Sequence, residues 1–285
     1  MSNYIKCNLC QSDDTKKLYV KDSFNIVRCR KCGLVYVNPR PTLEELKELY
    51  KEKDAHIDPA REKDLFMHRF KRIIKTIERF KKKGKLLDIG CSYGYFLKLA
   101  QGYGWETYGI EISDYVSHYC RQKLNLNVFT GDVREAHYPS QYFDVITMFH
   151  VLEHVLDPLD YLREINRILK PDGLIVVEVP NIGSLKAKLA KKNWISFKPP
   201  EHLYYFSLKT IIQFLNETGF QPVKVDTSGG TYTLTALDKL GLENVRQGVI
   251  RHFKYLAWLK NLVQFIQKLL RWQDVIIVYA QKKED

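Results

Sequence analysis

The chain has no run of about 18 consecutive apolar residues, the length that a membrane-spanning helix needs. Its first residues, Met1 to Lys6, lack the apolar core of a secretory signal peptide. Internal repeats and low-complexity segments are absent, and the cysteines are not spread along the chain as in a disulfide framework. We therefore expect a cytoplasmic protein with reduced thiols.

The length and net charge of the chain limit the number of domains and the kinds of partner. The chain has 285 residues and is 45% hydrophobic, which fits one large domain, or one domain with a small module. Its formal net charge is +12. Such a balance is found in proteins that bind nucleic acid, anionic membranes or phosphorylated substrates, and also in proteins whose lysine-rich surface has no partner.

Four of the six cysteines lie close together near the N-terminus, as Cys7-x-x-Cys10 and Cys29-x-x-Cys32. Two such pairs at this separation predict a zinc site with four thiolate ligands. Gly33 supplies the permissive backbone that follows such a pair. The zinc would be structural, because four thiolates leave no open coordination position. The other two cysteines are expected to be small buried hydrophobes: Cys91 and Cys120.

Three segments follow from composition and periodicity. We expect a zinc ribbon over residues 1–40 and a helical lead-in over residues 41–83. The lead-in would hold a short helix after the N-cap Thr42, with Glu45 in the capping-box position, and a longer amphipathic helix over 62–80. Residues 84–285 would form the main domain, with a helical insertion over 233–272.

Strands and helices alternate in the main domain. Strands are expected at about 85–91, 106–112, 127–132, 143–150 and 173–180, with helices between them. A helix over 207–219 and strands over 222–227 and 274–281 follow. This alternation predicts an α/β fold with a parallel sheet covered by helices on both faces.

The strand at 85–91 ends in a glycine-bearing turn. Asp88 closes the apolar run, Gly90 and Gly94 follow, and an amphipathic segment begins. Such a strand–turn–helix crossover predicts a ligand site at the C-terminal end of the strand, where glycines allow a close approach of the backbone. A dinucleotide site would need glycines at 90, 92 and 95, but Ser92 and Tyr95 stand there.

The pattern Asp88-x-Gly90-x-x-x-Gly94 resembles motif I of the class I S-adenosylmethionine-dependent methyltransferases, which have a glycine where Ser92 stands. The resemblance continues through 143–155 and 169–181 and covers roughly residues 85–228 and the last strand. It implies a Rossmann-like sheet of seven strands, parallel except for the last, and S-adenosylmethionine as cofactor.

Acidic residues at successive strand ends extend the cofactor site. Glu111 lies 21 positions after Gly90, where a carboxylate can accept hydrogen bonds from ribose hydroxyls. The family resemblance assigns Asp132, after the third strand, to the adenine amino group. Phe149, at the end of the fourth strand, completes the expected cofactor-binding set.

The acceptor is expected above the ends of the fourth and fifth strands, where candidate bases gather: His150, His154, Glu201 and His202. The segment 201–207 resembles a loop of bacterial methyltransferases in sugar and polysaccharide biosynthesis. Deoxysugar C-methyltransferases use a Glu–His pair as base and share a zinc module, but carry a further C-terminal domain. The resemblance implies methyl transfer to a hydroxyl, carbon or amine of a sugar, glycan intermediate or related small metabolite. Packing or capping roles for the same side chains stay open.

A metal-assisted alternative rests on the same residues. In RNA 2′-O-methyltransferases and quinone-precursor O-methyltransferases, a Glu-x-x-Glu-His set with a later histidine holds a divalent ion. The corresponding set here would be His150, Glu153, His154 and His202. A second alternative is a nucleic-acid-binding module, which the ribbon disfavours because it has few clustered basic and aromatic residues.

Two basic segments flank these motifs, at 184–198 and 245–272. The second has the spacing of a basic amphipathic helix, which suits peripheral contact with an anionic membrane. It equally suits packing over the sheet edge, or onto a second subunit in a homodimer.

Overall fold

The computed structural model describes residues 4–42, 45–46, 59–228 and 273–283. At its centre lies a seven-stranded sheet in the order β10-β11-β8-β7-β4-β5-β6. The strands are β4 (Lys85–Ile89), β5 (Glu106–Glu111), β6 (Asn127–Thr130), β7 (Phe143–Phe149), β8 (Leu169–Pro180), β10 (Phe220–Ser228) and β11 (Val275–Lys282).

The sheet is parallel except for β11. Strands β6, β5, β4, β7 and β8 pair in parallel, whereas β11 pairs antiparallel with both β8 and β10. The expected Rossmann-like methyltransferase sheet is thus confirmed, including the inserted last strand. Strand order reverses between β4 and β7, and in open α/β sheets ligands bind at that point, beyond the carboxyl ends of the strands.

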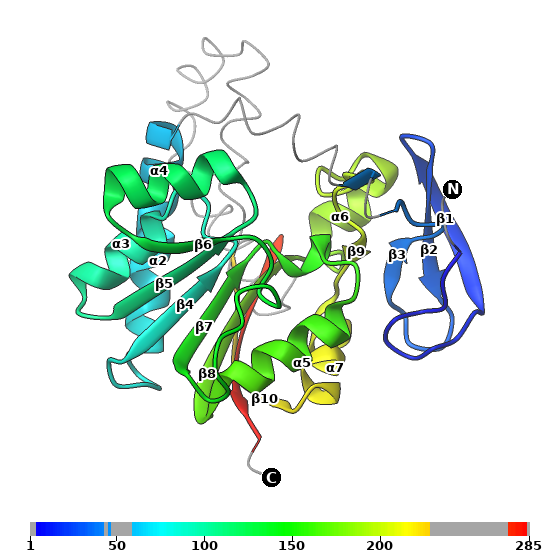
Figure 1. Cartoon of the computed structure of the whole chain (residues 1–285). Coiled ribbons are helices and arrows are strands. Elements are labelled where there is room, and N and C mark those ends of the chain that lie inside the picture. Colours follow the sequence, from blue (N-terminus) through cyan, green and yellow to red (C-terminus); the bar gives the residue numbers. More distant parts are fainter. Residues whose placement is uncertain (1–3, 43–44, 47–58, 229–272, 284–285) are drawn as a thin grey trace, which may run out of the picture.

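Helices cover both faces of the sheet (Figure 1). Helices α2 (Pro59–Ile77), α3 (Tyr95–Gly102) and α4 (Asp114–Leu124) pack on one face, and α5 (Pro158–Ile168) and α7 (Leu208–Glu217) pack on the other. Side-chain caps set where three of them begin, because Ser113, Asp157 and Ser207 accept hydrogen bonds from backbone N–H groups of the first turn.

A second sheet joins the N-terminal ribbon to the main domain. Strands β1 (Thr15–Lys21), β2 (Phe24–Cys29) and β3 (Val35–Val37) form an antiparallel sheet, and its fourth strand is β9 (Tyr204–Tyr205) from far along the chain. Figure 1 shows the blue ribbon strands beside the main domain, with β9 between them. Trp194 and Phe197, from the basic segment 184–198, are buried against this sheet rather than exposed.

Several expectations fall at the limits of the described residues. The Thr42 capping box is present, since Thr42 N donates to Glu45 Oε2 and Glu45 N to Thr42 Oγ1. The rest of that short helix lies outside the described residues. So does the whole of the insertion 233–272, which contains the basic segment 245–272. The division of the chain at residues 40 and 83 stays a prediction. Among the described residues, no helix is long and apolar enough to cross a membrane.

Candidate active site

The turn after β4 has the left-handed backbone that glycine favours. Gly90 and Gly94 both have φ of 69°, and Ser92 between them has φ of 46°. A Cβ on Gly90 would lie 2.5 Å from Val151 Cγ2, and one on Gly94 would lie 2.4 Å from Leu126 Cδ1. These glycines are therefore required by backbone conformation and by packing within the protein, as well as by any close approach of a ligand.

Asp88 lies at the end of β4 and is almost fully buried. Its Oδ1 accepts a 2.6 Å hydrogen bond from Thr147 Oγ1 on the neighbouring strand. Burial raises the pKa of Asp88 to about 7, although the Thr147 hydrogen bond opposes the rise. The carboxyl group is thus close to half ionised at neutral pH, and a cation placed beside it would favour the charged form.

A cavity of about 180 Å³ adjoins this turn. Asp88, Gly90 and Ser92 line it together with Arg69, His150 and a cluster of aromatic rings: Phe66, Phe70, Phe96 and Phe149. An aromatic cluster in the same cavity as a buried carboxyl group fits a ligand with a flat ring system and a cationic group. Gly94, in contrast, faces Leu126 and Cys120 rather than the cavity.

Glu111 ends β5 and ties the glycine turn to the next strand. Its Oε2 accepts a hydrogen bond from Ser92 N at 2.9 Å, and its Oε1 accepts one from Ser113 N at 3.0 Å. Two backbone donors thus orient the carboxylate at the carboxyl edge of the sheet. Glu111 lies outside the wall of the small cavity, and its binding of the cofactor ribose stays a prediction.

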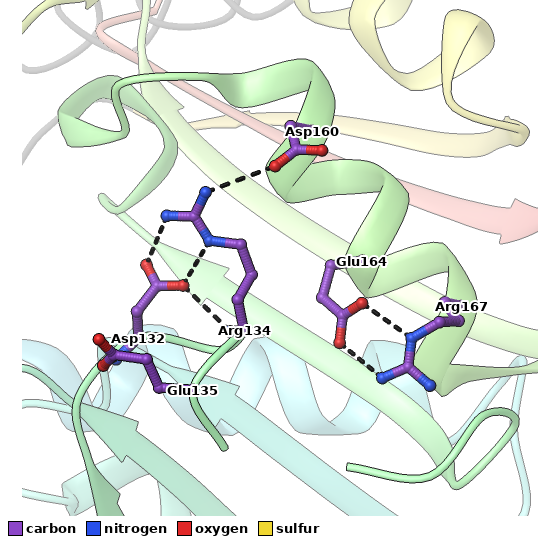
Figure 2. Close-up of polar contacts among 6 residues, drawn as sticks. All are labelled: Asp132, Arg134, Glu135, Asp160, Glu164 and Arg167. Carbon is purple, nitrogen blue, oxygen red and sulfur yellow. Dashed lines mark hydrogen bonds and ion pairs between the residues drawn. The ribbon is translucent and has the colours of Figure 1, made fainter. Parts of the chain in front are cut away.

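Asp132 follows β6 and is engaged by an arginine (Figure 2). Arg134 donates to both carboxylate oxygens of Asp132, from Nε at 2.7 Å and from Nη2 at 3.3 Å, and its Nη1 lies 3.4 Å from Asp160. The hydrogen bond to Asp132 raises the pKa of Arg134. A ligand that reaches Asp132 must share the carboxylate with Arg134, a residue that the sequence motifs did not identify.

His150 connects the cofactor cavity to a buried acidic pair. Its Nε2 lies 2.9 Å from Glu178 Oε1 and its Nδ1 lies 3.2 Å from Glu153 Oε1. Arg69 of α2 forms an ion pair with the same Glu178 oxygen. Motif reasoning missed Glu178 and Arg69. The sequence did contain a signal, because Glu178 is the lone acid inside the apolar run 174–179. A carboxylate in such a buried strand needs a charged or hydrogen-bonding partner.

This pairing changes the proton affinity of His150. Burial by itself would lower the pKa of His150, but the hydrogen bonds to Glu153 and Glu178 raise it to about 10. Burial would likewise raise the pKa of Glu153, yet the hydrogen bond from His150 lowers it to about 2. These two hydrogen bonds favour the protonated form of His150, which makes it a poor candidate for a base.

His154 and His202 form a second, neutral pair. Their rings meet edge to face with centroids 4.7 Å apart. Burial lowers the pKa of both, for His202 to about 3 with a further contribution from His154. Glu153 and Glu201 lie close enough to His154 to oppose this shift. The structure thus brings together predicted residues from two segments about fifty positions apart.

Glu153, His154 and His202 have the arrangement of metal ligands. One ligand atom from each lies within 4.8 Å of the others. Among the described residues, neither Glu153 Oε2 nor His202 Nδ1 has a hydrogen-bond partner, although both atoms are buried. Buried polar atoms without partners are costly, and a bound cation satisfies both. His150, the fourth member of the predicted set, is turned to Glu178 and Glu153 instead.

Comparison with known proteins gives the family. A family model described as "Methyltransferase domain" matches residues 64–225, more than half of the chain. The chain belongs to the class I S-adenosylmethionine-dependent methyltransferases. The described residues fit this cofactor, because the cavity offers an aromatic wall, a buried carboxyl group and the Glu111 carboxylate beyond it.

The methyltransferase is similar to three known proteins. It is 27% identical over 215 residues to the uncharacterized protein MJ1252 of Methanocaldococcus jannaschii, over 71% of this chain and 82% of that protein. It is 30% identical over 105 residues to a ubiquinone biosynthesis O-methyltransferase of Coxiella burnetii, over 35% of this chain and only 45% of that enzyme. A crystal structure of a methyltransferase from Archaeoglobus fulgidus aligns with a TM-score of 0.54 and 27% identity, over 83% of this chain and 99% of the other.

The four N-terminal cysteines of the methyltransferase converge on one point. Cys7 Sγ and Cys32 Sγ are 3.5 Å apart, as are Cys10 Sγ and Cys29 Sγ, and all four sulfurs lie within 4.8 Å of one another. A tetrahedral zinc site with bonds of about 2.3 Å places its sulfurs about 3.8 Å apart. The donor set and spacing therefore fit zinc.

Hydrogen bonds connect the loop that carries Cys7 and Cys10 to the segment that carries His202. Tyr204, two residues after His202, hydrogen-bonds through its hydroxyl to Asn8 Oδ1 at 2.7 Å and to the Leu156 carbonyl at 3.0 Å. Asn8 lies between two of the cysteines. Leu203 N also donates to the Glu153 carbonyl at 2.8 Å. The ribbon thus helps to hold the segment that carries His202.

Proposed function

We propose that this methyltransferase transfers a methyl group to a hydroxyl group of a sugar, a glycan intermediate or a related small metabolite, with the His154–His202 pair as general base. Carbon and amine acceptors are alternatives. The observation that carries the proposal is the neutral His154–His202 pair, in which His202 is buried and His154 half-buried, and which is linked through Glu153 and His150 to the cofactor cavity.

The pair suits proton removal better than His150 does. A general base must be unprotonated before the reaction, and the lowered pKa values of His154 and His202 keep both imidazoles neutral. A pKa of about 3 makes His202 a weak base, so His154 is the better proton acceptor of the two. Glu153 and Glu201 stand beside His154, where a carboxylate stabilises the imidazolium that forms. S-adenosylmethionine supplies the electrophilic methyl group. The preference for a sugar acceptor comes from the likeness of segment 201–207 to loops of sugar-modifying methyltransferases.

The proposal is tested with labelled S-adenosylmethionine and a panel of acceptors: nucleotide sugars, glycan intermediates, catechols and RNA. We expect transfer to a hydroxylated small molecule. We also expect His154→Gln to lower kcat at least about a hundredfold with little change in cofactor affinity, since general-base catalysis contributes that much. His118→Gln, an exposed histidine of α4, is the matched control. Equal activity of the two variants would exclude His154 as the base.

A second candidate is metal-assisted transfer at Glu153, His154 and His202. The unpartnered atoms Glu153 Oε2 and His202 Nδ1 favour it. A divalent ion there would lower the pKa of an acceptor hydroxyl and remove the need for a protein base. Metal analysis of the purified protein separates the two mechanisms. One zinc per chain, with activity unaffected by added Mg²⁺ or Mn²⁺, would eliminate the metal-assisted route, whereas a second ion lost in Glu153→Gln would support it.

For the ribbon we propose a structural zinc ion bound by Cys7, Cys10, Cys29 and Cys32. The convergence of the sulfurs supports it. A zinc content of one ion per chain, abolished by Cys7→Ser, is the expected result. A cytoplasmic location, a homodimer and membrane contact through 245–272 remain proposals, to be tested by fractionation, light scattering and vesicle flotation.

A further inference from the structure

A cleft of about 530 Å³ runs between α2 and the edge strand β10, away from the glycine turn. Five side chains that are positively charged at neutral pH line it: Lys71, Arg72, Lys75, Arg79 and Lys224. Thr76 and His68 complete the wall on the α2 side, and Asp226 contributes a single negative charge from β10.

The cations of α2 and of the turn after it form one stripe. Lys71, Arg72 and Lys75 project from the same face of the helix, and Arg79 follows four residues later, in the turn beyond Ile77, where α2 ends. All four are exposed. At a rise of about 1.5 Å per residue, the helical part of the stripe is about 6 Å long, and Arg79 extends it beyond the end of α2. The whole stripe is therefore longer than a single phosphate or sulfate ion can contact.

The four cations of the stripe are not neutralised within the described part of the protein. Asp226 already forms an ion pair with Lys224, and Glu78 lies 3.9 Å from Lys83 rather than from the stripe. No ion pair joins a stripe cation to a described carboxylate. Like charges spaced four residues apart destabilise a helix, so the stripe is a cost to the fold that a bound anion would offset.

The lining indicates which kind of anion fits. Among the described residues that line the cleft, none is a phenylalanine, tyrosine or tryptophan, so bases of a nucleic acid lack the large rings on which they stack. None is aliphatic either, and the surface is concave, which does not suit a flat membrane that takes up apolar side chains. Guanidinium groups bind phosphate oxygens in pairs and lysines act as point charges, so the set suits several linked phosphates.

We propose that this cleft binds an oligophosphate, a chain of two or three linked phosphate groups, through Lys71, Arg72, Lys75, Arg79 and Lys224. Two sources share this chemistry: a free oligophosphate, and the phosphate chain of a nucleotide or nucleotide-linked compound. The site lies on a face of α2 next to the one that carries Arg69 into the cofactor cavity, and it does not depend on which acceptor is methylated.

The experiment uses calorimetric titration of the full chain with inorganic tripolyphosphate, pyrophosphate and orthophosphate. The variant is Arg72→Gln with Arg79→Gln, and the matched control is Lys16→Gln with Lys17→Gln, two exposed lysines of β1. We expect tripolyphosphate to bind at least about tenfold more tightly than orthophosphate, with affinity falling as salt rises. The variant should lose about tenfold or more and the control less than twofold. Affinity for S-adenosylmethionine should stay the same in both.

Nucleoside diphosphate and pyrophosphate are then compared. Tighter binding of the nucleoside diphosphate identifies a nucleotide as the source, and equal binding identifies the phosphate chain alone; both results support the site. Three results would overturn it: no tripolyphosphate binding at millimolar concentration and low salt, an equal loss in the control variant, or binding through these arginines only to single-stranded RNA or to phosphatidylglycerol vesicles.

Discussion

Replacing Asp88 with asparagine should make the methyltransferase more stable and a poorer binder of its cofactor. Asp88 is fully enclosed, and burial raises its pKa from 3.8 to about 7. A group whose pKa is higher in the folded state contributes no penalty below the unfolded pKa and a growing penalty as the pH rises to the folded pKa. The free energy of unfolding should therefore fall between about pH 4 and pH 7 on account of this one group.

The size of the effect follows from the shift. A difference of about three pKa units at 1.36 kcal/mol each corresponds to at most about 4 kcal/mol above pH 7. At pH 5 the same reasoning gives about 1–2 kcal/mol. The substituted amide would keep an oxygen that accepts the hydrogen bond from Thr147, so the variant removes the buried charge with little else. Asp88→Asn should thus gain more stability at pH 8 than at pH 5.

Urea unfolding of both proteins at pH 5 and pH 8 measures this difference, with Asp172→Asn as the control. Asp172 is an exposed acid whose pKa is lowered by Lys81, so its replacement should change stability little. Cofactor titration over the same range gives a second readout. Affinity of the wild-type protein should rise with pH up to about 7, because the cationic cofactor favours ionised Asp88, whereas the variant should bind weakly at every pH. A less stable Asp88→Asn protein at pH 8 would refute the reasoning.

Three further predictions concern the turn, the acidic pair and the ribbon. Gly90→Ala should lower the free energy of unfolding by about 1–3 kcal/mol and abolish cofactor binding, because the added Cβ clashes and the backbone is left-handed. Gly102→Ala should be tolerated, because its added Cβ meets nothing within 4 Å. Thermal unfolding and cofactor titration compare the two variants. Glu178→Gln should lower the pKa of His150 by removing one of its two carboxylate partners, and an NMR titration of the imidazole that stays near pH 10 would contradict this. Chelation of zinc should increase hydrogen exchange at Tyr204 while leaving cofactor affinity intact, and an unchanged exchange rate would show that the ribbon does not hold this segment.

Local patterns in the sequence predicted the elements and the cofactor edge well. The alternation of apolar strands with amphipathic helices predicted the sheet, and the strands lie within a few residues of their expected positions. The turn signal worked because Gly90 and Gly94 adopt positive φ, a property of the residues themselves. The cysteine pairs were recognisable for the same reason, since spacing alone brings two thiolates to one side of a knuckle turn.

Contacts between segments far apart in the chain could not be predicted from local sequence patterns. One partner of Glu178 is Arg69, more than a hundred residues earlier. The apolar run around Glu178 indicates that it needs a partner, but nothing local indicates which residue supplies it. Arg134 was missed because its capture of Asp132 depends on the path of the loop after β6. The pairing of β3 with β9 was equally invisible, because two residues of strand carry no periodic signal.

The sequence by itself determined the family and the edge of the sheet where the cofactor binds, because the Asp88–Gly94 turn and the carboxylates at strand ends are local features. Only the tertiary structure decided which histidines can act as bases. Their proton affinities depend on burial and on neighbours from other segments, which favour the protonated form of His150 and the neutral forms of His154 and His202.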